Sequence, residues 1–124
     1  LFMLVKSYDL TGGALDWATA TALGHAILND GISFIIDSAG RYEVLPFYSR
    51  NGNETMHMLK EYKISLMHVE EDDPYPIDDG PWSANIPGQE YGYTGPTPEI
   101  AICRCVVAYK LGEDIEIPNE LLKV

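Results

Sequence analysis

The residues of this sequence that could do chemistry do not have the spacing of a known catalytic motif. The chain has three histidines, and they lie far apart, whereas a zinc site usually takes close pairs such as His-x3-His. There is no Gly-x-Ser-x-Gly nucleophile motif, and Gly12-Gly13 lacks the lysine of a phosphate-binding loop. We therefore expect no catalytic residues, no metal ligands and no cofactor. A small enzyme that processes a nucleotide is still one of three hypotheses for the function, and it ranks below the two binding functions given at the end of this subsection.

The other candidate metal ligands are two cysteines and an acidic segment. Cys103 and Cys105 are two residues apart in a predicted helix, where they point about 200° apart and cannot easily share a metal or a disulfide. We expect reduced thiols, at least one of them in the core. Residues 70–79 contain carboxylates that could bind a divalent cation, but their spacing differs from that of a calcium-binding loop. We interpret this segment as a solvated run of charge.

Large aromatic side chains beside glycine and proline form the main candidate site. Aromatic rings in loops can stack on a planar ligand or form the centre of a protein interface. The alternative is packing beneath the loops, above all for Trp17 and Trp82. Arg104 could meet a phosphate group. The predicted ligand-binding residues are Trp17, Trp82, Tyr91, Tyr93, Thr94, Thr97 and Arg104.

Asp16 is a further residue of interest, because it lies in a predicted helix of otherwise small and apolar side chains. It could face solvent in the first turn, where the helix dipole favours an acid. It could instead pair with Arg104 of the second predicted helix. A buried Asp16–Arg104 pair would specify how the two helices pack while adding little net stability. We predict this structural pair rather than a catalytic role.

Two helices that would position these residues are predicted from apolar spacing and capping residues. Residues 14–23 follow Thr11, a candidate N-cap, and end before a glycine. Residues 99–111 follow Thr97, a second candidate N-cap, and end at Gly112. The apolar stripe of the second helix consists of Ile100, Cys103, Val107 and Leu111.

Strand signals lie between the two helices. Residues 32–45 are rich in strand formers around a turn, which predicts a β-hairpin, and residues 62–69 alternate as a third strand. Residues 56–59 could open that strand or sit on a short helical turn. The element order predicts one α+β domain over residues 1–124, with an antiparallel sheet of three to five strands and two main helices packed on one face.

Composition limits the classes of function. The chain has 124 residues, of which 46% are hydrophobic, enough for the core of one domain. The formal net charge of -11 argues against direct binding to a nucleic-acid backbone, which requires a basic surface. No apolar run approaches the roughly 20 residues of a membrane-spanning helix, so we expect no membrane partner.

The first residues are apolar but too few for the core of a signal peptide, which predicts a cytoplasmic protein. Met3 is a candidate natural start, with Leu1-Phe2 an added remnant, and a trimmed longer chain is the equal alternative. A homo-oligomer is a further expectation, because domains of this kind often leave an apolar sheet face or edge to cover.

Two segments resemble the NinX-like bacteriophage proteins. Residues 10–18, Leu-Thr-Gly-Gly-Ala-Leu-Asp-Trp-Ala, resemble the family's Leu-Thr-Gly-Ala-Ala-Leu-Asp-Trp-Ala opening, and residues 95–108 look like its Gly-Pro-Thr-Pro-Leu-Ile-Ala-Ala-Met-Arg-Cys-Tyr-Val-Ala segment. The run of residues 110–118 and Trp82-Ser83-Ala84 extend the likeness to roughly half of the chain. The region 50–90 departs from the pattern, since residues 53–61 stand where the family has Gly-Gly-Pro-Ile-Ile-Glu.

The resemblance implies a small accessory protein of tailed phages or prophages, present in the cytoplasm of the infected host, with no established activity. Our first hypothesis is a non-catalytic binding module, a counter-defence protein that sequesters a nucleotide-type immune signal of the host. The alternative is an acidic inhibitor that imitates nucleic acid and binds a bacterial host protein. The acids of residues 70–79 and 113–120 are the feature behind that alternative.

Overall fold

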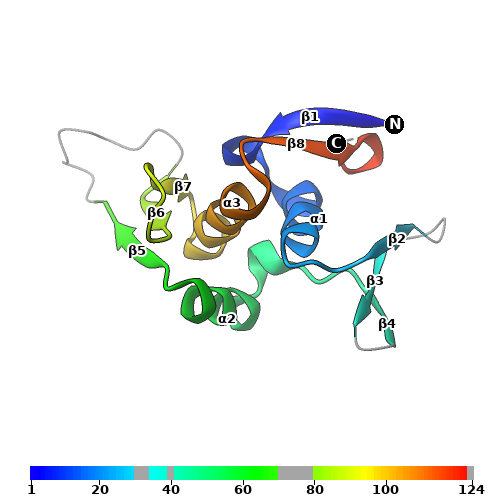
Figure 1. The fold of residues 1–124 in the computed structure, drawn as a ribbon, viewed down its shortest axis with the longest axis horizontal. Coiled ribbons are helices and arrows are strands. Elements are labelled where there is room, and N and C mark those ends of the chain that lie inside the picture. Colours follow the sequence, from blue (N-terminus) through cyan, green and yellow to red (C-terminus); the bar gives the residue numbers. More distant parts are fainter. Residues whose placement is uncertain (30–33, 39–40, 70–79, 123–124) are drawn as a thin grey trace.

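The computed structural model describes residues 1–29, 34–38, 41–69 and 80–122. These residues form three α-helices and eight β-strands, all in antiparallel pairs, which confirms the predicted α+β class. The strands are divided among three small sheets rather than joined in one, and a third helix accompanies the two predicted ones (Figure 1). None of the helices in the described ranges has the length and apolarity needed to cross a membrane.

Helix α3 (Pro98–Leu111) is the centre of the core and contacts both other helices and the strands β6 and β7, whereas the sheet of β2, β3 and β4 lies beyond α1 (Figure 1). The Thr97 hydroxyl accepts a hydrogen bond from the Ile100 N–H at 3.2 Å, which confirms the predicted N-cap. Residues Ala101–Val107 are all buried, so the apolar surface of this helix surrounds it rather than forming a single stripe. Leu111, which we placed on that stripe, is exposed.

Helix α1 (Gly12–Ala22) lies against α3, and its buried residues include several alanines that allow close approach of the two helices. Thr11 occupies the N-cap position as predicted, but its side chain makes no capping hydrogen bond there. The Thr19 hydroxyl instead donates to the Leu15 carbonyl at 2.8 Å, which satisfies a polar group within the core.

Helix α2 (Gly52–Tyr62) was not predicted, since we expected residues 56–59 to open a strand or sit on a short helical turn. The Asn51 side chain accepts hydrogen bonds from the N–H groups of Asn53 and Glu54, and Met58 packs into the core. The helix ends at Lys63, whose φ of 55° is left-handed without the help of a glycine. The missed signal was Asn51 followed three residues later by Glu54, a pattern typical of a helix start.

The three sheets lie around the helices (Figure 1). The first sheet is a two-stranded ribbon in which the strand that begins at Phe2, β1, pairs with the strand that begins at Asp114, β8. Lys6 is opposite Asp114 in this pair, and a 2.6 Å ion pair joins their side chains. Their bounds are β1 (Phe2–Lys6) and β8 (Asp114–Pro118). The second sheet contains β2 (Ile27–Asn29), β3 (Phe34–Ser38) and β4 (Arg41–Val44), and the third contains β5 (Ser65–His68), β6 (Trp82–Asn85) and β7 (Tyr93–Gly95).

The predicted hairpin is confirmed by the pairing of β3 with β4, although residues 39–40 of its turn lie outside the described residues. The predicted third strand is shorter than expected, because residues up to Tyr62 complete α2 and only Ser65–His68 form β5. The acidic segment of residues 70–79 also lies outside the described residues.

Strand β7 approaches α3 so closely that Gly95 is required at the contact. A Cβ atom added to Gly95 would lie 2.8 Å from the Ala101 backbone nitrogen and 2.9 Å from Cγ2 of Ile100. Neither neighbour can move easily, since one is helix backbone and the other is attached to it. This contact fixes β7, and with it the residues just before Gly95, against the central helix.

Candidate functional site: a tyrosine-lined cavity

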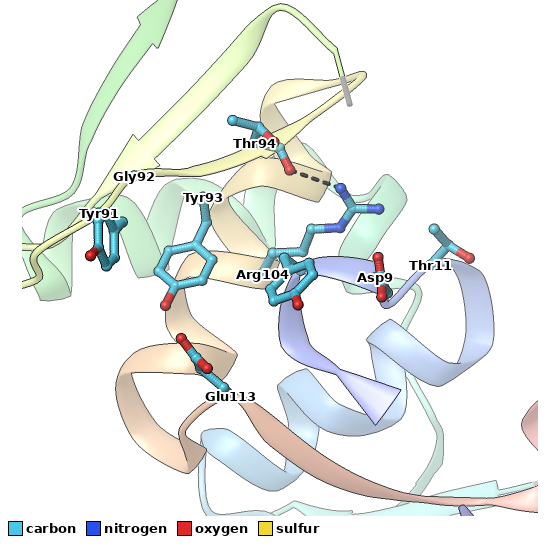
Figure 2. A pocket seen from close by; sticks show the side chains of 9 residues that line it. Asp9, Thr11, Tyr91, Gly92, Tyr93, Thr94, Arg104 and Glu113 are labelled. Atoms are coloured by element: carbon cyan, nitrogen blue, oxygen red, sulfur yellow. Dashed lines mark hydrogen bonds between the residues drawn. The ribbon is translucent and has the colours of Figure 1, made fainter. Parts of the chain in front are cut away.

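A cavity of about 700 Å³ lies where η1 (Ser7–Asp9), β7, α3 and the start of β8 meet. Its lining combines aromatic rings with carboxylate groups, and Arg104 lies between Tyr93 and Asp9 (Figure 2). It is lined by Tyr8, Asp9, Thr11, Tyr91, Gly92, Tyr93, Thr94, Arg104 and Glu113.

Segments far apart in the sequence are brought together here by backbone hydrogen bonds. Because β1 pairs with β8, η1 lies beside Glu113, and the Ser7 N–H donates to the Glu113 carbonyl at 2.7 Å. This arrangement places Tyr8 and Asp9 on the same cavity as Glu113. The opposite wall comes from β7 and the turn before it, which carry Tyr91 and Tyr93.

Arg104 holds the two walls to the central helix. Its side chain is only 2% exposed, its Nε donates to the Leu10 carbonyl at 2.9 Å, and its Nη1 donates to the Thr94 carbonyl at 2.8 Å (Figure 2). One guanidinium group therefore joins α3 to the segment before α1 and to β7. Hydrogen bonds from a charged donor are among the stronger ones in proteins. Here one acceptor is Thr94, which lines the cavity, and the other is Leu10, which lies between the lining residues Asp9 and Thr11.

Asp16 and Arg104 have different partners, whereas we expected them to form a pair. Asp16 is 2% exposed, and its Oδ1 accepts a hydrogen bond from the Ser49 N–H at 2.7 Å, whereas Arg104 donates to the backbone near the cavity. No interaction given for the described residues joins the two side chains. The physical reason is their direction: Asp16 faces η2 (Tyr48–Arg50), and Arg104 faces the segment before α1.

Burial raises the pKa of the Asp16 carboxyl group above its ordinary value of 3.8, while the hydrogen bonds from Ser49 and the charge of Arg50 oppose this shift. In the interval above pH 3.8 the folded protein therefore binds more protons than the unfolded chain. The free energy of unfolding contributed by Asp16 falls as the pH rises through that interval to the raised pKa, and it stays low above it.

We expect Asp16→Asn to remove this part of the pH dependence, because the amide oxygen still accepts the Ser49 N–H but carries no charge. Asp16→Ala should lower the free energy of unfolding by about 1–3 kcal/mol, since the buried N–H then has no acceptor. Urea denaturation from acidic to neutral pH measures both effects. An Asn variant with the same pH slope as the parent protein would contradict the assignment.

The tyrosines of the cavity differ in exposure. Tyr8 is 46% and Tyr91 is 65% exposed, whereas Tyr93 is half-buried. Burial raises the pKa of the Tyr93 hydroxyl, and the nearby charge of Glu113 raises it further, so this group is protonated at neutral pH. Figure 2 shows the Glu113 carboxylate on the same side as the Tyr93 hydroxyl. The cavity thus offers aromatic faces beside polar groups.

The structure brings together part of the predicted ligand-binding set. Tyr91, Tyr93, Thr94 and Arg104 line the cavity, although Arg104 donates to carbonyl groups rather than facing a ligand alone. The other three predicted residues lie elsewhere. Trp17 lines a separate hollow with Phe2 and Leu4, and Thr97 caps α3. Trp82 lies in β6, where the centre of its ring is 4.8 Å from that of His68.

Four residues that line the cavity are not in the predicted ligand-binding set: Tyr8, Asp9, Gly92 and Glu113. Tyr8 was recognisable as an aromatic residue at the end of an element, but no local pattern connects it to a turn more than eighty residues later. Its position depends on the pairing of β1 with β8. The carboxylates gave no signal either, because the chain contains many acidic residues and most of them could face solvent.

The two thiols are not available as nucleophiles. Cys103 and Cys105 are buried, and burial raises the pKa of each to about 12, so both are protonated at neutral pH. Cys105 Sγ also lies 3.1 Å from Oε1 of Gln89. Within the described residues, no group of three or more His, Cys, Asp or Glu side chains is placed to hold a metal ion.

No protein-family model matches the chain, and no curated protein matches it in sequence. The resemblance to the NinX-like family therefore stays a prediction.

Proposed function

We propose that the protein is a non-catalytic binding module that captures a small nucleotide-type ligand in the tyrosine-lined cavity. The observation that carries this proposal is the grouping of Tyr8, Tyr91 and Tyr93 on one cavity of about 700 Å³. That volume lies in the range of small-molecule sites, which usually combine apolar walls with a few polar groups. Aromatic side chains stack on bases of any sequence, because every base has a π-face.

The orientation of such a ligand follows from the charges of the site. Arg104 donates to the Leu10 and Thr94 carbonyls, and the carboxylates of Asp9 and Glu113 lie at the same cavity. With a formal net charge of -11 for the whole chain, a phosphate group is repelled from this region. We therefore place the base among the tyrosines and the phosphates at the open side of the cavity, toward solvent. This placement differs from the expectation that Arg104 could meet a phosphate group.

The biological role that we propose is that of a phage or prophage accessory protein acting inside an infected bacterium. It would hold a nucleotide signal of the host's immune response and release it unchanged, which lowers the free concentration of the signal. The support for this role is the resemblance of residues 10–18 and 95–108 to NinX-like phage proteins.

Mass spectrometry of small molecules released by heating the purified protein tests the proposal directly. The protein is expressed with and without an active host nucleotide-signalling system. A stoichiometric nucleotide recovered intact only with that system supports sequestration, and a modified nucleotide indicates an enzyme instead. Release of nothing from folded protein in either case contradicts the proposal and favours a protein partner, to be sought by pull-down at low salt.

The tyrosine that tests the site most cleanly is Tyr91, because its exposed side chain contributes little to the core. We expect Tyr91→Ala to weaken binding of a fluorescent cyclic dinucleotide by about 5–100-fold, the effect of losing one stacked ring. Tyr42→Ala is the matched control, since Tyr42 is similarly exposed on β4 and does not line the cavity. Fluorescence anisotropy measures both affinities, and an equal loss in the two variants would argue against this site.

A further inference from the structure

Two carboxylate groups of the cavity are open to a ligand. Arg104 directs donors at the carbonyls of Leu10 and Thr94. Asp9 and Glu113 are both exposed, and among the interactions given for the described residues their carboxylates accept no hydrogen bond and make no ion pair, so their oxygens face solvent or a ligand. An ionised carboxylate is an acceptor only. A ligand that fills this cavity is therefore favoured if it brings N–H or O–H donors and disfavoured if it brings further acceptors.

Glu113 is the better placed of the two carboxylates for a ligand stacked on the tyrosines. Its charge is close enough to raise the pKa of the Tyr93 hydroxyl, and Figure 2 shows the two side chains on the same side of the cavity. Asp9 lies on the other side, next to Thr11 (Figure 2). The position of Glu113 is fixed through its backbone, because its carbonyl accepts the Ser7 N–H and β8 begins at the next residue.

We infer that the cavity selects a planar group with two adjacent N–H donors, which in a nucleotide is the edge of a guanine base, and that Glu113 accepts both donors. This inference rests on the proposed function, since it names the base that the binding module takes. Guanine presents its N1–H and its N2 amino group side by side, and the two oxygens of one carboxylate match that spacing.

The other bases fit this arrangement less well. Adenine places an acceptor nitrogen beside its amino group, so a lone pair would face the carboxylate. Uracil has one N–H between two carbonyl oxygens, and cytosine has an acceptor nitrogen beside its amino group. Hypoxanthine keeps the N1–H but lacks the amino group, which makes it the closest probe with one donor fewer. A site built to accept hydrogen bonds discriminates strongly against analogues that leave its polar groups unpaired.

Isothermal titration calorimetry with nucleosides tests the inference without the charge of a phosphate. We expect guanosine to bind at least about tenfold more tightly than inosine or adenosine, and Glu113→Gln to reduce guanosine affinity by about tenfold or more. The same variant should change adenosine binding little. Glu116→Gln is the matched control, because Glu116 is an exposed acid of β8 that does not line the cavity. Thermal denaturation confirms that each variant is folded.

The outcomes separate this inference from the proposed function. Adenosine binding as tight as guanosine binding, or a Glu113→Gln variant with unchanged guanosine affinity, overturns the inference and leaves the nucleotide proposal standing. Free arginine, whose guanidinium is also planar with adjacent N–H donors, is the remaining probe. Arginine binding without any nucleoside binding supports the two-donor chemistry and overturns the nucleotide proposal. Binding of none of these probes to folded protein overturns both.

Discussion

Arg104→Met is expected to lower the free energy of unfolding by about 2–6 kcal/mol, because it leaves two buried carbonyl groups without a donor and each such group costs about 1–3 kcal/mol. Methionine keeps much of the length of the side chain and its apolar contacts. It has no donor, so the Leu10 and Thr94 carbonyls lose the hydrogen bonds of 2.9 Å and 2.8 Å that they now accept. Urea denaturation monitored by tryptophan fluorescence measures the change.

Arg50→Met is the control for this experiment. Arg50 is exposed, and its guanidinium lies 4.5 Å from the centre of the Phe47 ring, an interaction worth about 0.5–1 kcal/mol at a surface. A loss for Arg104→Met as small as that for Arg50→Met would show that Arg104 does not hold the cavity walls together. Arg104→Lys should recover only part of the stability, because an ammonium group cannot reproduce the planar fork that reaches both carbonyls.

Gly95→Ala is expected to lower the free energy of unfolding by about 1–3 kcal/mol, the usual range for overpacking, and to weaken binding at the cavity. The added methyl group would lie 2.8 Å from the Ala101 nitrogen, so β7 must move away from α3. Tyr93 and Thr94 precede Gly95 in β7 and move with it. The readouts are urea denaturation and the affinity for the fluorescent cyclic dinucleotide.

Gly13→Ala should have the opposite effect on stability. A Cβ atom at Gly13 meets only Cδ2 of Leu121, at an ordinary contact distance of 3.5 Å, and Gly13 lies in helix α1. Alanine in a helix is favoured over glycine by about 0.5–1 kcal/mol, so this variant should gain a similar amount. If Gly95→Ala were as stable as the parent protein, the close approach of β7 to α3 would be contradicted.

The elements that the sequence predicted correctly are those with strong local signals. Helix α3 has a capping threonine, a proline in its first turn and a terminal glycine, and the hairpin of β3 and β4 has runs of strand formers around a turn. Helix α2 was missed because Asn51-Gly52-Asn53 has the composition of a turn, although Asn51 caps the helix. The number of sheets could not be predicted, since strand pairing depends on contacts between distant segments.

The residues of the candidate site also differ in whether local sequence could predict them. Tyr91, Tyr93 and Thr94 were found from sequence because they lie in a short aromatic segment with glycines, where the chain must turn. Tyr8, Asp9 and Glu113 join them only because β1 pairs with β8 and places η1 against the start of that strand.

The amino-acid sequence by itself determined the α+β class, the positions of α1 and α3, and the turn that carries Tyr91 and Tyr93, since each depends on neighbours along the chain. The tertiary structure decided which aromatic residues share a cavity and which partner each buried charge takes. Asp16 bonds to Ser49 and Arg104 to two carbonyl groups because long-range packing, which no local spacing encodes, set the direction in which each side chain points.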